Sequence, residues 1–150
     1  MPAQDVVDEQ WNVGLLLFVP YRAMEVRVLD ALAAAGFDDL TMAQARVMQR
    51  LAPGGSRVTE LSDKARVAKQ TAGVLVDQLE RNGYVTRRPD PADGRARLVQ
   101  LAERGLAAAA VAGVEVARVE AEWTVHVGVG EMRRLRATLG RLREITDLSS

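Results

Sequence analysis

The chain has 150 residues, of which 48% are hydrophobic and 27% are charged, so it is long enough to bury a core and too apolar to stay disordered. It contains no cysteine, which excludes disulfides, thiolate metal sites and thiol-based redox sensing. The N-terminus is acidic, and the apolar run from Val13 to Tyr21 is far shorter than a membrane span. We therefore expect a cytoplasmic protein with no membrane partner.

The net charge of zero is unevenly distributed along the chain. Residues 1–56 carry a surplus of three acidic side chains, residues 57–105 carry a surplus of three basic ones, and residues 106–150 are balanced. So small a basic surplus usually reflects solvated charged faces, and charge alone does not establish a nucleic-acid partner.

A first helix is predicted from near Asp5 to Ala35. Its middle, between Val13 and Val19, is apolar on nearly every face. Such a segment needs partners on more than one side, which in a chain this small suggests burial against a second subunit. Pro20 is expected to kink the helix, and Gly36 is expected to close it as a C′ glycine.

A second helix is predicted from a capping box, Thr41-Met42-Ala43-Gln44, to near Ala52. Leu40 and Ala45 are placed for a hydrophobic staple across its start. The loop Pro53-Gly54-Gly55-Ser56 follows.

Two helical runs separated by a tight break come next. The first begins at Thr59 and ends at Ala65, and the second follows a break from Arg66 to Lys69. It ends at Asn82-Gly83, where glycine can take a left-handed conformation. One face of the second run is an apolar stripe of Ala72, Leu75, Val76 and Leu79. The opposite face carries Lys69, Gly73, Asp77 and Glu80. One face therefore packs and the other is presented, as in a helix-turn-helix.

A β-hairpin with a basic tip is predicted after this motif. Alternating residues from Tyr84 to Arg88 and from Ala96 to Leu101 indicate two strands, and the turn formers between them lead to Arg95 at the tip. A helix fits the major groove of DNA, and an arginine on a thin loop reaches the minor groove. The combination is typical of a winged helix.

Two further helices complete the chain. The first is predicted to run from Ala102 to Val125, with a stripe of mostly small residues at Leu106, Ala109, Ala110, Gly113, Ala117 and Ala121. Gly128 and Glu131 suit the start of the second, in which Met132, Leu135, Leu139 and Leu142 recur at heptad-like spacing. The first and last helices of two subunits would then interlock. The alternative is that these stripes are the core of a monomer.

The segment from Val58 to Gly105 resembles the winged-helix core of MarR-type transcriptional regulators, including the wing pattern Asp93-x-Arg95-x-Arg97. The flanking segments have the family's lengths and order, so the resemblance extends over nearly all of the chain. It implies one mostly α domain with a small β wing, in which residues 41–101 form the DNA-binding core and residues 1–36 and 103–150 form dimerisation helices. A short strand at Arg57-Val58 would lie beside the wing.

The resemblance also implies a function, that of a bacterial, ligand-responsive repressor that binds a pseudo-palindromic duplex operator as a homodimer. The alternative is a winged helix that binds a protein partner and no DNA. The basic start of the recognition helix and the arginines of the wing favour the DNA-binding regulator.

Candidate DNA contacts lie at the start of the recognition helix. Lys69 can donate to guanine, Gln70 can make a paired contact to adenine, and Thr71 can bind phosphate or touch a thymine methyl. Gly73 weakens a helix by about 1 kcal/mol relative to alanine, which suggests that something approaches closely there. One residue departs from the family pattern: Ala68 replaces the usual hydroxyl cap.

In the wing, Arg95 matches the family's minor-groove arginine, and Asp93 with Arg97 matches a pair that holds the loop in shape. Arg87 and Arg88 are candidates for phosphate contacts, although a solvated strand edge explains either equally well.

Family members commonly bind a small, often aromatic and anionic, effector between the dimerisation helices and the winged helix. By this resemblance Trp11, Phe18, Tyr21 and Arg22 can line such a crevice, and the alternative is that they pack in the core or an interface. No cofactor is expected. The only histidine, His126, has apolar neighbours typical of a structural histidine, and no phosphate loop, nucleophile elbow or HExxH motif occurs, so we do not expect an enzyme.

Overall fold

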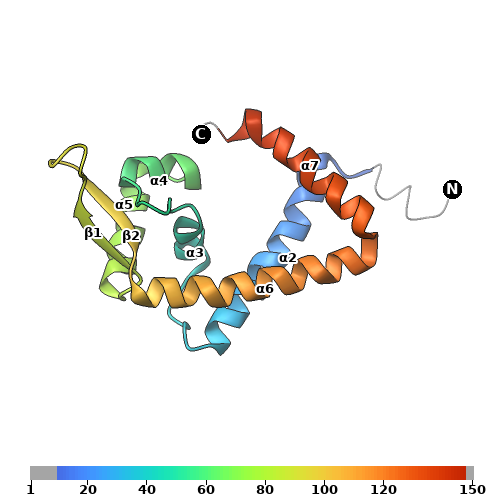
Figure 1. Ribbon diagram of the computed structural model, residues 1–150, viewed down its shortest axis with the longest axis horizontal. Coiled ribbons are helices and arrows are strands. Elements are labelled where there is room, and N and C mark those ends of the chain that lie inside the picture. The colour runs from blue at the N-terminus through green and yellow to red at the C-terminus, as the bar shows by residue number, and fades with distance from the viewer. Residues whose placement is uncertain (1–9, 148–150) are drawn as a thin grey trace.

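The computed structural model describes residues 10–147, which form six helices and one two-stranded antiparallel sheet (Figure 1). The elements follow in the order α2 (Val13–Ala34), α3 (Met42–Gln49), α4 (Val58–Ala65), α5 (Lys69–Arg81), β1 (Val85–Pro89), β2 (Arg97–Leu101), α6 (Glu103–Val127) and α7 (Val129–Thr146). The hairpin lies at one end of the molecule, and α6 runs from it toward the other end, where the chain turns back into α7 (Figure 1). The predicted mostly helical fold with a small β wing is confirmed.

Helix α2 begins later than predicted. The side chain of Asn12 accepts a hydrogen bond from the amide of Leu15 at 2.8 Å and caps the helix, so the expected continuous helix is interrupted before Val13. The rest of the predicted start, residues 5–9, lies outside the described residues. The helix continues through Pro20. It ends as predicted, because Gly36 has φ +97° and the amide of Phe37 donates to the carbonyl of Leu32 at 2.9 Å.

Helices α3, α4 and α5 form the helical part of the winged helix. The predicted capping box is present, with Thr41 and Gln44 each bonding the other's backbone amide. Helix α3 ends at Gln49 rather than near Ala52. The apolar stripe of α5 is buried as predicted, and it packs in one core with Leu61 of α4 and other apolar side chains.

The wing hairpin pairs β1 and β2, with Val85 opposite Leu101 and Pro89 opposite Arg97. The third strand edge is shifted from its predicted position. Ser56 forms the bridge, with two backbone hydrogen bonds of 2.9 and 2.8 Å to Val99, whereas Arg57 occupies the N-cap position of α4 and Val58 already belongs to that helix. Because α4 begins only two residues after Ser56, the loop before α4 contributes only this one residue to the sheet.

Tyr84, which precedes β1, is fully buried and joins three parts of the chain. Its hydroxyl donates to the carboxylate of Asp39, and burial followed by this carboxylate raises the pKa of Tyr84 to about 12. Arg104 of α6 stacks 4.3 Å from its ring centroid and pairs with Asp39 at 2.9 Å. Close by, a Cβ at Gly105 would stand 2.1 Å from the carbonyl oxygen of Tyr84, so only glycine lets α6 cross the chain here.

The predicted small-residue stripe of α6 is not its packed face. The buried positions of this helix are Gly105, Ala108, Glu115 and Val119. The residues of the predicted stripe are exposed in this single chain.

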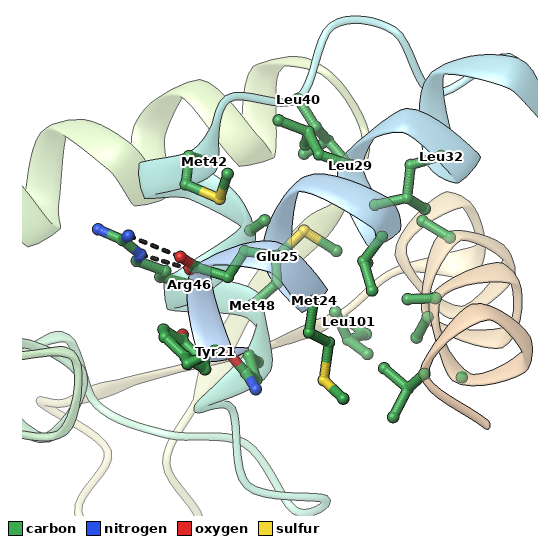
Figure 2. Close-up of a pocket in the computed structure, with 18 residues that line it drawn as sticks. Tyr21, Met24, Glu25, Leu29, Leu32, Leu40, Met42, Arg46, Met48 and Leu101 are labelled. Carbon is green, nitrogen blue, oxygen red and sulfur yellow. Dashed lines mark hydrogen bonds and ion pairs between the residues drawn. The ribbon is translucent and has the colours of Figure 1, made fainter. Parts of the chain in front are cut away.

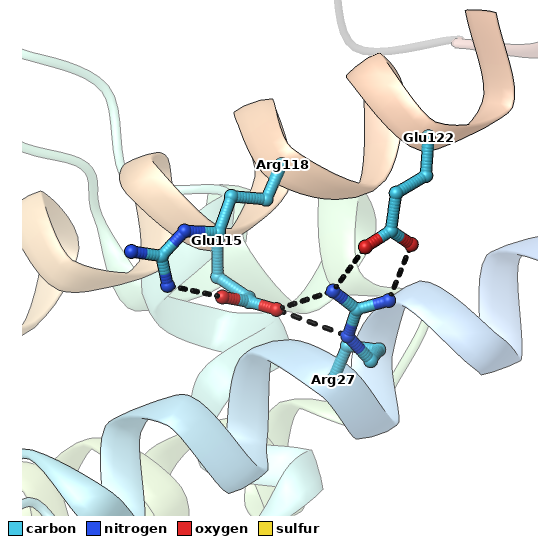
Figure 3. A network of polar contacts seen from close by, with 4 residues as sticks. All are labelled: Arg27, Glu115, Arg118 and Glu122. Carbon is cyan, nitrogen blue, oxygen red and sulfur yellow. Dashed lines mark hydrogen bonds and ion pairs between the residues drawn. The ribbon is translucent and has the colours of Figure 1, made fainter. Parts of the chain in front are cut away.

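A polar network fastens α2 to α6 (Figure 3). Arg27 of α2 donates to both oxygens of Glu122 at 2.7 and 3.1 Å, and it contacts the buried Glu115 at 2.9 Å. Arg118 pairs with the other oxygen of Glu115 at 3.2 Å. The two carboxylates hold the pKa of Arg27 above its ordinary value, so this crossing is fixed by charge-assisted hydrogen bonds as well as by apolar packing.

Helix α7 returns along the molecule without burying any residue of its own. Leu135, Leu139 and Leu142, the heptad-like leucines, are all exposed, and so are the apolar residues at the start of α2. At its C-terminal end α7 meets the winged helix, where the carbonyl of Thr146 accepts from Arg66 at 2.8 Å. No helix among residues 10–147 is long and apolar enough to span a bilayer.

Candidate nucleic-acid interface

The first turn of α5 is open to solvent, and no side chain among residues 10–147 covers it. Ala68 has extended backbone angles and offers no side-chain cap, as the sequence predicted, so the first amides of α5 point outward. Lys69, Gln70 and Thr71 are exposed, and their side chains have no hydrogen-bond or ion-pair partner within residues 10–147. Free amides at the positive end of the helix dipole attract phosphate, and the three side chains beside them can reach base edges.

Gly73 lies one turn further along the same side of α5. Apart from its chain neighbours and the backbone of α5 itself, an added Cβ there would meet no atom of the described residues within 4 Å, so packing against them does not require glycine at this position. The structure thus removes the commonest structural reason for a helix-weakening residue in mid-helix.

Arg87, a predicted phosphate contact, is held by the acidic side of α5. Its guanidinium donates to Asp77 at 2.7 Å and to Glu80 at 2.8 Å. Burial alone lowers the pKa of Arg87, but hydrogen bonds to these carboxylates raise it overall. Arg87 therefore fastens the wing to α5, and binding phosphate would require it to exchange partners.

Arg88 is oriented by the opposite side of the hairpin. It donates to the side chain of Gln100 at 2.8 Å and to the carbonyl of Gly54 at 2.7 Å. These bonds use its Nε and Nη2 atoms and fix the loop before α4 against the sheet.

The base of the wing is organised by Asp90, a residue that sequence reasoning did not single out. Its carboxylate is buried, accepts two hydrogen bonds from Arg57 at 3.0 and 2.7 Å, and accepts a third from the amide of Ala92 at 2.9 Å. The Ala92 amide first and then Arg57 hold the pKa of Asp90 below its ordinary value. The only local signal was an Asp-Pro turn, because the partner Arg57 lies far away in sequence.

The predicted brace between Asp93 and Arg97 does not form. Within the described part of the chain no ion pair joins them, and the carboxylate of Asp93 instead accepts from the amide of Arg95 at 3.1 Å. An aspartate that bonds the backbone two residues on is the commoner solution in a tight turn. Arg95 and Arg97 are exposed, and among residues 10–147 neither guanidinium has an internal partner.

A cavity of about 270 Å³ lies between α2, α3 and α6, beside the winged helix (Figure 2). Of the four predicted effector residues only Tyr21 lines it. Trp11 precedes α2 and is 40% exposed, Phe18 is 53% exposed, and Arg22 lies outside the lining. These three were selected for residue type, which does not determine whether a side chain reaches the cavity.

Helix α3 connects this cavity with the recognition helix. Ala45, Arg46 and Met48 line the cavity. On the same helix the buried Gln44 donates to the side chain of Gln78 on α5 at 2.9 Å. This hydrogen bond joins α3, which lines the cavity, directly to α5.

His126 is exposed near the end of α6, so the prediction of a structural histidine is wrong. Its apolar sequence neighbours, Val125 and Val127, do not determine whether the histidine side chain is buried. Among the described residues no cluster of histidine and acidic side chains could hold a metal ion.

The described residues have the parts of a winged helix-turn-helix protein. Helices α3, α4 and α5 pack together, Ser56 bridges to the β1–β2 hairpin, and α5 is exposed beside a basic loop. Residues 38–96 match the model of a family described as the MarR family. No curated protein matches the sequence significantly.

Solved structures extend the similarity over the whole fold. A transcriptional regulator of Thermotoga maritima is 27% identical, covers 89% of this chain and 93% of its own, and superposes with a TM-score of 0.60. The MarR family protein Rv2887 of Mycobacterium tuberculosis, in a complex with salicylic acid, is 26% identical over 88% of this chain and 96% of its own, with a TM-score of 0.64. Apo MarR of E. coli has the same fold, with 24% identity, 88% and 97% coverage, and a TM-score of 0.68.

Residues 38–96 thus match the MarR family model, and the chain as a whole has the fold of transcriptional regulators of that family. These relatives are transcriptional regulators and not enzymes.

Proposed function

We propose that this protein is a homodimeric, ligand-responsive repressor that binds a pseudo-palindromic operator. The observation that carries the proposal is the pair of free basic elements: the first turn of α5 and the wing tip. Lys69, Gln70 and Arg95 have no partners among residues 10–147, whereas the arginines behind them are fixed by acids or carbonyls. A surface that reads DNA bases requires unpaired side chains held on a rigid scaffold.

In this proposal α5 enters the major groove with Lys69, Gln70, Thr71 and Gly73 toward the bases. Arg95 enters the neighbouring minor groove, where the potential is most negative, and Asp93 shapes the turn that presents it. Arg97 and Arg88 lie toward the phosphates. Residues 41–101 are the DNA-binding core, and residues 1–36 and 103–150 are the dimerisation helices.

The dimer is supported by apolar surface that a monomer leaves uncovered. Five consecutive residues of α2, from Leu15 to Val19, are exposed together with Leu135, Leu139 and Leu142 of α7. Contiguous apolar surface of this kind marks an interface, and a second copy of the chain offers the same surfaces in return. A regulator with this role acts on the genome, and we place it in the cytoplasm.

Effector control is supported by the cavity between α2, α3 and α6 and by the complex of Rv2887 with salicylic acid. A ligand that binds the cavity displaces α3, and the hydrogen bond from Gln44 to Gln78 transmits this movement to α5. Because the two recognition helices of a dimer must fit half-sites at fixed spacing, a small change in the position of α5 lowers operator affinity.

Selection from a random duplex library tests the proposal without knowledge of the target genes. The expected product is a pseudo-palindrome whose half-site centres lie about 10 bp apart. Affinity for it should fall by about 10³ to 10⁵ between about 50 and 200 mM salt if six to ten phosphates are contacted. Failure to enrich any sequence, together with a flat salt response, would favour a winged helix that binds a protein partner.

A further inference from the structure

The walls of the cavity between α2, α3 and α6 are mostly apolar, and their neutral polar groups are those of Tyr21 and Gln49. Its lining includes Leu29 and Leu32 of α2 and the methionines Met24, Met42 and Met48 (Figure 2). Ala112 and Val116 of α6 also line it. Such a surface favours the apolar body of a ligand and gives no compensation to a charge that loses its water.

Only two charged residues line the cavity, and each neutralises the other. Arg46 donates through Nε and Nη2 to the two carboxylate oxygens of Glu25 at 2.6 and 2.8 Å, as the dashed lines in Figure 2 show. The side chain of Glu25 is only 9% exposed. The hydrogen bond from Arg46 is the largest cause that lowers the pKa of Glu25, so the carboxylate is ionised near neutral pH. The donor pair with which arginine usually grips a ligand carboxylate is thus occupied.

A second guanidinium, that of Arg22, stands outside the cavity. It lies 4.0 Å from Glu25, and its Nη1 contacts the sulfur of Met42 at 3.7 Å. Its side chain is as exposed as that of Arg46, at 45%, but it does not line the cavity, so its charge faces water and not a bound ligand.

We propose that the effector of this regulator is an uncharged, largely apolar molecule that carries a hydrogen-bond donor for Glu25. This inference rests on the ligand-responsive function proposed above and narrows its ligand class. A carboxylate that enters the cavity either takes Arg46 and leaves the buried Glu25 without its cation, or finds only the neutral donors of Tyr21 and Gln49 in a mostly apolar lining. An amide or phenol avoids both penalties and can donate to an oxygen of Glu25 while the Arg46 pair stays intact.

This ligand class differs from the anionic effector that the family resemblance implies, and salicylate and salicylamide distinguish the two. The molecules share a ring and a hydroxyl and differ in charge near neutral pH. In titration calorimetry on the full-length protein, salicylamide should bind about 10- to 100-fold more tightly than salicylate, the range expected for hydrogen bonds to charged groups. In the same samples salicylamide should release a selected operator at lower concentration.

The variant Glu25→Gln tests the cause of this preference. It removes the carboxylate and frees Arg46, so salicylate should now bind more tightly than salicylamide. Glu122→Gln is the matched control, because it weakens another two-oxygen pair between α2 and a neighbouring helix, that with Arg27, and Glu122 does not line the cavity. It should leave the wild-type preference unchanged.

Tighter binding of salicylate to the wild type would overturn the inference, and so would the absence of salicylamide binding at millimolar concentration. Either result leaves ligand-free operator affinity intact, so it is distinguishable from failure of the DNA-binding proposal. If salicylamide binds with the expected preference but does not release DNA, the ligand class is supported and the ligand-responsive part of the proposed function is refuted.

Discussion

Gly73 allows fold stability and DNA binding to be separated with a single methyl group. It lies inside α5, and among the described residues the Cβ of an alanine would meet no atom within 4 Å other than those of its chain neighbours and the α5 backbone. Alanine in a helix interior is favoured over glycine by about 1 kcal/mol. Gly73→Ala should therefore raise the melting temperature by about 2 to 4 °C for a domain of this size.

The same methyl group should weaken operator binding. It projects from the face of α5 that carries Gln70 and Asp77, which is the proposed groove side. If the helix backbone lies close to the bases, the methyl group forces a small displacement, and overpacking of a close contact costs about 1 to 3 kcal/mol at each half-site. The protein should thus become more stable and bind its operator less well.

Thermal melts and fluorescence-anisotropy titrations of the same preparations check both halves. Random duplex is the control, because backbone-dominated binding should change much less. Unchanged operator affinity in a stabilised Gly73→Ala protein would show that DNA does not approach α5 at this point. A lower melting temperature would instead refute the assignment of this face as free of internal packing.

Three further substitutions test the fold, the acid response and the dimer. Gly105→Ala should lower the free energy of unfolding by at least about 3 kcal/mol in denaturant titrations, because its Cβ would stand 2.1 Å from a backbone carbonyl; a protein of wild-type stability would refute the close crossing of α6. The pKa of Asp39 is lowered, first by the hydroxyl of Tyr84. The ionised carboxylate therefore contributes to the stability of the fold above its unfolded pKa, and this contribution is lost as pH falls below about 4. At neutral pH the free energy of unfolding of the wild type should therefore exceed that of Asp39→Asn by no more than about 1 kcal/mol, since the carboxylate is partly exposed. This difference in stability should vanish in acid. If it persists in acid, the ionised carboxylate of Asp39 is not its cause. Leu139→Glu should convert the proposed dimer to a 16.3 kDa monomer in light scattering while Thr138→Glu does not, and a dimer that survives Leu139→Glu would exclude this part of α7 from the interface.

Local signals were sufficient to predict the elements that place the site. The capping box at Thr41, the glycine after α2 and the apolar stripe of α5 each depend on residues within two helical turns of one another, and the structure confirms all three. Periodicity also predicted the hairpin to within a residue or two. These features follow from the backbone geometry of helices and strands, and the spacing of residues along the chain is sufficient to predict them.

The features that sequence reasoning missed depend on partners brought together by folding. Asp90 organises the wing base through Arg57, which is 33 residues away, and Arg87 is drawn to acids on α5. The cavity combines residues of three helices, and no local pattern indicated that Arg46 forms an ion pair with Glu25. Asp93 is the exception, because its actual partner is local: its carboxylate accepts from the amide of Arg95 two residues on and does not pair with the guanidinium of Arg97.

Operator recognition by the winged helix is tested most directly by titrating wild type, Gln70→Ala and Arg95→Ala against the selected operator, its single-base variants and random duplex. Gln70→Ala should relax preference by about 1 to 3 kcal/mol at one or two central positions of each half-site and leave binding to random duplex nearly unchanged. Arg95→Ala should weaken binding mainly where flanking A·T pairs narrow the minor groove. If both variants remain folded dimers and bind every duplex as the wild type does, neither α5 nor the wing contacts DNA, and the winged helix must serve another partner.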